Sequence, residues 1–154
     1  LADVGCGYGS FINYLCSNRT LNIEKYEGYD LCPDLIAECK NRINKDWASF
    51  KIGTHPLNST MFTIMSGTYN LAVTTDVSLW EEYIFDSLKK CWEKTTLAMI
   101  FNLQIADTTF ISENQIYYAK RASVLELCVS YFGPTKIVLH EDLPKDTTFV
   151  VVKP

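Results

Sequence analysis

The chain has 154 residues, a net charge of −4, 47% hydrophobic residues and 21% charged residues. This length suits one domain with a substantial core, and the composition is that of an ordinary soluble globular protein. An acidic chain is a poor general binder of DNA or RNA, and no apolar run approaches the roughly 20 residues of a membrane span. We therefore expect neither nucleic acid nor a membrane as a partner.

The first half of the chain alternates strand and helix signals. Residues 10–16 predict a helix with Phe11, Tyr14 and Leu15 on one face, and a second helix begins at Pro33, where the missing N–H costs nothing. Residues 54–68 predict a loop with one helical turn. The strands predicted in this half are residues 1–4, 24–30 and 47–52.

The second half continues the alternation. Residues 69–75 are nearly continuous in apolar and β-favouring residues, which predicts a fourth strand buried on both faces. Residues 80–94 give the clearest amphipathic helix. The remaining expected elements are a strand at 95–102, a polar loop at 103–115, a helix that ends near Phe132 with Gly133 as its stop, and strands at 135–140 and 148–153. This order predicts an α/β, doubly wound sheet.

The first strand runs directly into a turn with glycine at residues 5, 7 and 9, and Asp3 precedes it. Glycines permit a tight strand-to-helix turn with no Cβ in the way of a ligand. A dinucleotide fingerprint needs Gly-x-Gly-x-x-Gly, but residue 10 is Ser. An acid before the turn repels a pyrophosphate and suits a neutral or positively charged ligand. Asp30 lies 21 residues after Gly9, a distance at which a carboxylate reaches a ribose in nucleotide-binding folds.

These residues resemble a known family. Asp3-Val4-Gly5-Cys6-Gly7-Tyr8-Gly9 is similar to motif I of the class I S-adenosylmethionine-dependent methyltransferases, and Glu27-Gly28-Tyr29-Asp30-Leu31-Cys32-Pro33 matches the segment whose acid binds the ribose hydroxyls. The resemblance implies a Rossmann-like fold with seven strands in the order 3-2-1-4-5-7-6, the last antiparallel. It implies S-adenosylmethionine as cofactor and S-adenosylhomocysteine as product.

The resemblance covers nearly all of residues 1–154, which we expect to be a single methyltransferase domain. Family members usually have a helical segment before the first strand that covers the cofactor, and we expect it to be missing here. Phe101-Asn102-Leu103, the pair Tyr117-Tyr118 and the run from His140 to Pro144 also resemble a small bacterial subgroup of uncharacterised methyltransferases.

By this resemblance, the cofactor contacts follow the first four strands. Thr54 stands where many family members carry an acid for the adenine amino group. Simpler roles stay open: a plain tight turn for the glycines, a helix cap for Asp30, a buried structural acceptor for Asp3, and a loop residue for His55. The expected cofactor-binding residues are Asp3, Gly5, Cys6, Gly7, Tyr8, Gly9, Asp30, Leu31, Gly53, Thr54, His55, Thr75 and Asp76.

The implied reaction is an in-line methyl displacement, in which the protein mainly aligns two reactants and needs a base only if the acceptor must lose a proton. Tyr117 and Tyr118 also fit ordinary packing, and His140 also fits a solvated or structural residue. The segment 75–80 lacks the Asn/Asp-Pro-Pro motif of enzymes that methylate base or amide nitrogens, and no Pro-Cys pair is present, so we expect a small-molecule acceptor. The candidate catalytic residues are Asp76, Asn102, Tyr117 and His140, with Trp80 and Gln104 beside them.

The six cysteines include no Cys-x-x-Cys pair, and the chain has two histidines, so we expect neither disulfides nor a zinc site, and no other bound metal. Scattered core thiols are typical of a reducing cytoplasm. Two other functions remain open. One is a non-catalytic, cofactor-binding module of the same fold, which Thr54 keeps open. The other is a NAD-dependent oxidoreductase, against which Ser10 and Asp3 weigh.

Overall fold

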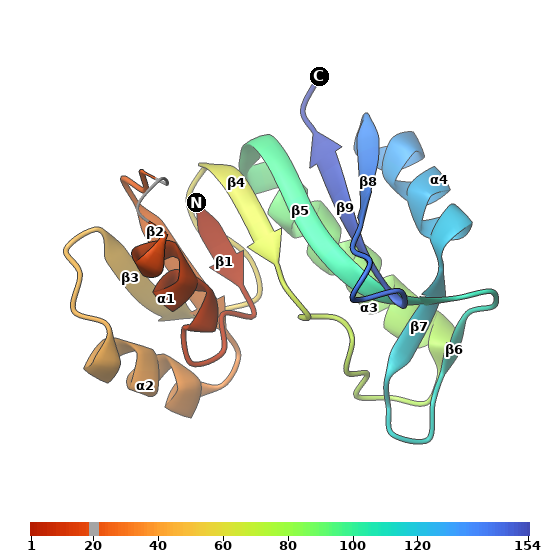
Figure 1. Cartoon of the computed structure of the whole chain (residues 1–154), viewed down its shortest axis with the longest axis horizontal. Coiled ribbons are helices and arrows are strands. Elements are labelled where there is room, and N and C mark those ends of the chain that lie inside the picture. The colour runs from red at the N-terminus through yellow and green to blue at the C-terminus, as the bar shows by residue number, and fades with distance from the viewer. Residues whose placement is uncertain (19–21) are drawn as a thin grey trace.

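The computed structural model describes residues 1–18 and 22–154, which form one sheet with helices on both of its faces (Figure 1). The elements, in chain order, are β1 Ala2–Val4, α1 Ser10–Ser17, β2 Tyr26–Asp30, α2 Pro33–Arg42, β3 Ala48–Ile52, β4 Thr60–Met65, α3 Val77–Lys94, β5 Thr95–Ala106, β6 Phe110–Ile111, β7 Tyr117–Lys120, α4 Arg121–Tyr131, β8 Thr135–Leu139 and β9 Asp146–Val152.

The described residues form one nine-stranded sheet, in which seven strands have the order β3-β2-β1-β4-β5-β9-β8, and β7 and β6 continue from the other side of β5. Neighbouring strands from β3 to β5 are parallel, and β9 runs antiparallel between β5 and β8. The predicted sixth and seventh strands are β8 and β9, so the predicted order 3-2-1-4-5-7-6 is confirmed. The parallel strands place their carboxyl ends at one edge, where ligands of open α/β sheets bind.

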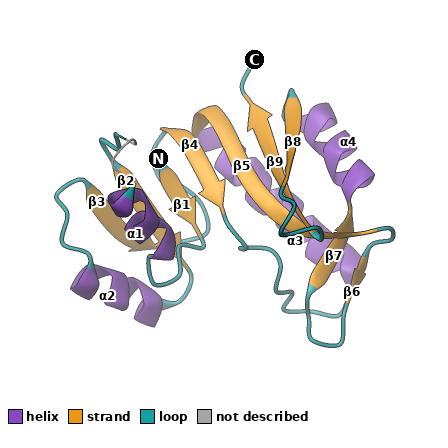
Figure 2. Ribbon diagram, viewed as in Figure 1, coloured by secondary structure: helices purple, strands orange, loops and turns teal. Residues whose placement is uncertain are grey.

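The two sheet faces carry different helices (Figure 2). Helices α1 and α2 bury Ile12, Leu15, Ile36 and Cys39 against β2 and β3. Helices α3 and α4 cover the opposite face, where their apolar residues pack with side chains of β1, β4, β5 and β9 in a larger core. In α1 the buried residues are Ile12 and Leu15, while the predicted face residue Tyr14 is 58% exposed.

The prediction of the fourth strand at residues 69–75 is wrong. The fourth strand is β4, Thr60–Met65, inside the segment predicted as a loop. Segment 69–75 is irregular and makes a single bridge, from Leu71 to Ile116. It buries Tyr69 and Ala72, three residues apart, and exposes Leu71 and Val73, so its apolar residues do not follow the alternation of a strand. The residues that follow the fourth strand are therefore 66–69.

The region after β5 also differs from its prediction. β5 extends to Ala106, and β6 and β7 form a hairpin in the region expected to hold a loop and the start of a helix. β7 pairs with the carboxyl end of β5, on the side away from β9. α4 then ends at Tyr131, and the N–H of Gly133 bonds to the carbonyl of Cys128, so the predicted stop is confirmed.

Candidate functional site

A glycine turn links β1 to α1 at the carboxyl edge of the sheet. Gly5, Gly7 and Gly9 all have positive φ, at 77°, 56° and 87°, a region that other residues rarely occupy. A Cβ on Gly5 would stand 2.6 Å from Oγ1 of Thr68, and one on Gly9 would stand 2.5 Å from Cδ1 of Ile43. The N–H groups of Gly5 and Cys6 donate to the Tyr29 carbonyl, at 2.7 and 3.0 Å, which ties the turn to β2.

Asp30, at the end of β2, lies against this turn. Its Oδ2 accepts the N–H of Gly7 and its Oδ1 accepts the N–H of Cys32, each at 2.9 Å. A carboxylate has about four acceptor positions, so each oxygen keeps capacity for another donor. The structure therefore brings the glycine turn and Asp30 together, as the sequence predicts.

A hollow opens beside this pair, which we call the strand-edge hollow. It has a volume of about 230 Å³, and Asp30 is the single charged residue among those that line it. Five of its residues were predicted as cofactor contacts, and these are Gly5, Asp30, Leu31, Gly53 and Thr54. The other lining residues are Val4, Thr68, Tyr69, Tyr83 and Ser87.

Four polar or aromatic residues of this hollow were not predicted from the sequence. Thr68 and Tyr69 follow the true fourth strand, so placing that strand correctly would have found them. Tyr83 and Ser87 are one helical turn apart on α3, a spacing that puts them on one side of the helix. Thr68 also donates to the Val4 carbonyl at 2.7 Å, which holds the loop after β4 over Gly5.

Asp3 is buried and does not line the hollow. It accepts a hydrogen bond from the Tyr26 hydroxyl, so its direct partner is a side chain rather than the turn. Burial raises the pKa of Asp3 to about 6, although the hydrogen bond from Tyr26 opposes this rise. The arrangement supports the structural role that the sequence left open. Four turn residues also lie outside the lining of the hollow, namely Cys6, Gly7, Tyr8 and Gly9.

The placement of Thr75 and Asp76 at the end of the fourth strand is wrong, because that strand ends at Met65. Both residues are exposed and line none of the cavities described here. Asp76 caps the amino end of α3, where its Oδ1 accepts the N–H of Leu79 at 3.1 Å. His55 lies beside Thr54, with its Nδ1 3.0 Å from the threonine Oγ1, and does not line the strand-edge hollow.

The four candidate catalytic residues do not converge. Besides Asp76, Tyr117 is buried and donates to Glu81 at 2.9 Å, and His140 lies exposed after β8. Asn102 belongs to a polar cluster at the carboxyl end of β5, in which Asp146 accepts from Asn102 at 2.7 Å and from Gln104 at 3.3 Å. Asn102 also accepts the N–H of Gly67 at 2.7 Å, next to Thr68 of the hollow.

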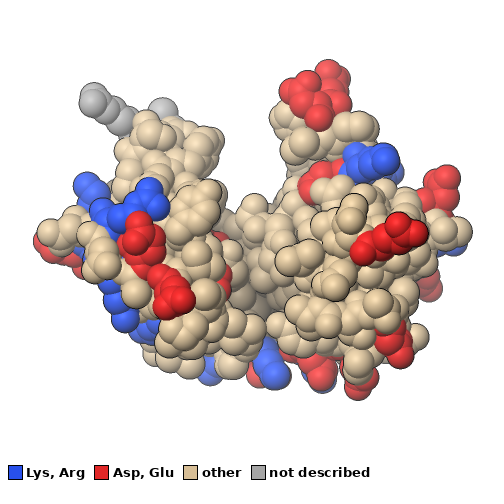
Figure 3. Space-filling view, turned by 90° about the horizontal axis from the view of Figure 1, so that it is seen from below, with Lys and Arg blue, Asp and Glu red and all other residues tan. Residues whose placement is uncertain are grey.

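A second hollow of about 650 Å³, the outer hollow, adjoins the first and shares Thr54, Tyr83 and Ser87 with it. Trp80, which also borders it, stacks on Tyr83 with ring centroids 5.0 Å apart and donates to the Tyr69 carbonyl. Figure 3 shows the molecule from below, the side to which β1 and β4 point; its surface is hollowed near the middle, and charged side chains lie mostly around the periphery.

Comparisons with known proteins give weak similarity in sequence and clear similarity in fold. No family model matches the chain. A Mycobacterium tuberculosis protein named "Putative methyltransferase Rv1506c" is 22% identical over 142 residues, which are 90% of this chain and 84% of that protein.

Two solved structures are similar in fold. Magnesium protoporphyrin IX methyltransferase from Synechocystis PCC 6803, solved with S-adenosylhomocysteine, has a TM-score of 0.71 at 12% identity and covers 99% of this chain and 73% of its own. A methyltransferase from Leishmania major has a TM-score of 0.71 at 15% identity and covers 99% of this chain and 63% of its own. The chain thus has the Rossmann-like fold of the S-adenosylmethionine-dependent methyltransferases. Within residues 1–18 and 22–154, no helix combines the length and apolar character needed to cross a bilayer.

Proposed function

We propose that the protein binds S-adenosylmethionine in the strand-edge hollow and transfers its methyl group to a small-molecule acceptor. The observation that carries this proposal is the position of Asp30, whose carboxylate rests on the glycine turn at the rim of an otherwise uncharged hollow. The fold and the similarity to the Mycobacterium tuberculosis protein named "Putative methyltransferase Rv1506c" support it.

The residues present fit this cofactor better than a dinucleotide. The free acceptor positions of Asp30 suit the two hydroxyls of a ribose, and its negative charge favours a ligand with a positive sulfur. A pyrophosphate would meet that same charge. The Gly7 N–H, which a dinucleotide site would use to hold phosphate, already donates to Asp30. These contacts weigh against the NAD-dependent oxidoreductase.

When bound, S-adenosylmethionine would supply a methyl group on a positively charged sulfur: the acceptor nucleophile bonds to the methyl carbon, the carbon–sulfur bond breaks, and S-adenosylhomocysteine leaves. The protein's part is to orient the two reactants. Leu31 is 61% exposed at the end of β2 and Tyr83 faces the hollow from α3, so both offer surface for a nucleobase. The Thr54 hydroxyl forms a hydrogen bond with the His55 ring and keeps two further hydrogen-bonding positions, which are available to the base.

A small acceptor is supported by the segment that actually follows the fourth strand. Residues 66–69 read Ser-Gly-Thr-Tyr, and they lack the two prolines expected for methylation of base or amide nitrogens. The cluster of Asn102, Gln104 and Asp146 lies at the carboxyl end of β5. Asn102 accepts the N–H of Gly67, the residue before Thr68 of the hollow, and we therefore place the acceptor on this side.

The proposal is tested in two steps. Calorimetric titration with S-adenosylhomocysteine and with NAD⁺ should give binding of the first alone. Release of S-adenosylhomocysteine is then measured over a panel of phenols, carboxylic acids and amines, and at least one class should give turnover. Binding of NAD⁺ without S-adenosylhomocysteine overturns the cofactor assignment. Cofactor binding with no turnover on any class contradicts the enzyme and favours the non-catalytic module.

A further inference from the structure

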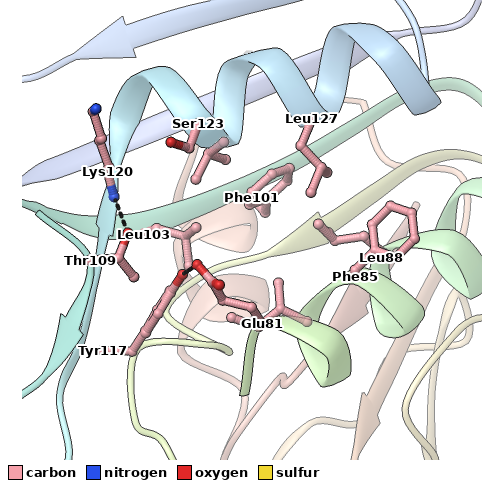
Figure 4. A pocket seen from close by; sticks show the side chains of 12 residues that line it. Glu81, Phe85, Leu88, Phe101, Leu103, Thr109, Tyr117, Lys120, Ser123 and Leu127 are labelled. Carbon is pink, nitrogen blue, oxygen red and sulfur yellow. Dashed lines mark hydrogen bonds between the residues drawn. The ribbon is translucent and has the colours of Figure 1, made fainter. Parts of the chain in front are cut away.

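A separate cavity lies between α3, α4 and β5, and we call it the interhelix cavity (Figure 4). Its volume is about 230 Å³. The apolar side chains that line it come from both helices and from the strand, and they point into the space between them. These are Ile84, Phe85, Leu88, Phe101, Leu103, Val124 and Leu127.

Helix α3 divides this cavity from the strand-edge hollow. Glu81, Ile84 and Leu88 face the interhelix cavity, whereas Tyr83 and Ser87 face the strand-edge hollow. Successive residues of a helix are about 100° apart, so the residues that face the interhelix cavity and those that face the strand-edge hollow lie on two different flanks of α3. The side of α3 between these flanks faces the sheet and packs in the core. The two sites share no lining residue, so the interhelix cavity is not a part of the proposed cofactor site.

One rim of the cavity is polar and hydrogen-bonded. The Tyr117 hydroxyl donates to Oε1 of Glu81 at 2.9 Å, and the two side chains meet in Figure 4. Burial and the neighbouring Glu81 raise the pKa of Tyr117, so its hydroxyl stays a neutral donor. Glu81 is exposed at this rim, and among the described residues its Oε2 has no hydrogen-bond or ion-pair partner, so the rim offers a solvent-accessible acceptor beside an apolar floor.

We propose that the interhelix cavity binds a small neutral molecule with one apolar ring and one hydroxyl, such as a monocyclic phenol. The ring lies on Phe101 and Leu103, and the hydroxyl donates to Glu81. An apolar protein cavity of about 150 Å³ holds benzene, so the larger volume here admits a ring with a few more atoms. An ammonium brings three donors to an apolar floor. Lys120 also lines the cavity, but its ammonium group points away from Glu81 in Figure 4, so an anion beside Tyr117 meets the Glu81 charge and a single hydroxyl matches this site best.

The test uses p-cresol, toluene and p-toluate as probes of nearly equal shape, with the methyl groups of the whole chain followed by NMR. We expect p-cresol to shift the methyl signals of Leu103, Val124 and Leu127 and to leave those of Val4 and Leu31 unchanged. Toluene, which lacks the donor, should bind about tenfold more weakly, and p-toluate should bind more weakly still. Saturating S-adenosylhomocysteine should not displace p-cresol, which separates this site from the proposed function.

Two pairs of variants locate the site. Leu127→Trp fills the cavity and should abolish the shifts, whereas Val129→Trp, on the exposed side of the same helix, should retain them. Glu81→Gln should weaken p-cresol severalfold while it keeps an oxygen for Tyr117, and Glu93→Gln on the same helix should not. Equal binding of toluene and p-cresol, p-cresol shifts confined to Val4 and Leu31, or unchanged binding in Leu127→Trp would each overturn the proposal.

Discussion

The turn between β1 and α1 contains a matched pair of glycines that isolates one steric contact. Gly5 and Gly7 both have positive φ, but a Cβ on Gly5 would stand 2.6 Å from Oγ1 of Thr68, whereas one on Gly7 meets nothing within 4 Å. Gly7→Ala therefore carries the backbone strain alone, about 1–2 kcal/mol, and Gly5→Ala adds an overpacking cost of about 1–3 kcal/mol. Thr68 cannot rotate away freely, because its hydroxyl bonds the Val4 carbonyl.

Urea unfolding of the two variants, followed by circular dichroism, measures this difference. We expect Gly5→Ala to be less stable than Gly7→Ala by about 1–3 kcal/mol. Adding Thr68→Ala should recover part of the Gly5→Ala loss, which a double-mutant cycle reports as a coupling energy. Equal destabilisation by the two glycine substitutions, together with zero coupling to Thr68, would refute the packing of the loop after β4 on this turn.

Three other predictions concern charge and cofactor contacts. The pKa of Asp3 is raised to about 6, so the native state binds this proton more tightly than the unfolded chain does. As pH rises from about 4 to about 6, the stability of the wild type should fall by up to about 3 kcal/mol relative to that of Asp3→Asn. Parallel pH profiles of the two proteins would contradict this. Burial raises the pKa of Glu27, but the ion pairs with Lys51 and Lys25 outweigh it, and the net shift of this pKa is downward. Lys51→Met should therefore lower the free energy of unfolding by about 1 kcal/mol at pH 7, and by less as pH falls below 4. Chemical denaturation at both pH values tests this. Tyr83→Ala should weaken binding of S-adenosylhomocysteine about tenfold by calorimetry, since stacking of a base on an aromatic ring contributes about 1–3 kcal/mol, and Tyr14→Ala, at an exposed residue of α1, should leave binding unchanged.

The predicted contact between the glycine turn and Asp30, which the structure contains, depends on local backbone chemistry. Three glycines at positive φ and a carboxylate at the end of the next strand can be recognised in the sequence without knowledge of the packing. The strand order followed from the family resemblance. Neither signal depends on the position of each later element.

The errors arose where tertiary packing overrides local pattern. Segment 69–75 is rich in β-favouring residues, but Tyr69 and Ala72 are buried at a spacing of three, and the strand is Thr60–Met65 instead. Because the strand was misplaced, Thr75 and Asp76 were expected at the hollow, whereas Thr68 and Tyr69 line it. β7 buries Tyr117 and Ala119 alternately, and this period of two could have identified it as a strand.

The most direct test of the central claim is calorimetric titration of S-adenosylhomocysteine into the wild-type protein, Asp30→Asn and Asp34→Asn. Asp34 is an exposed acid in the first turn of α2, outside the strand-edge hollow. We expect Asp30→Asn to bind about tenfold to a hundredfold more weakly, since hydrogen bonds to a charged acceptor contribute about 1.5–3 kcal/mol each, and Asp34→Asn to match the wild type. Wild-type affinity in a folded Asp30→Asn variant would contradict the account.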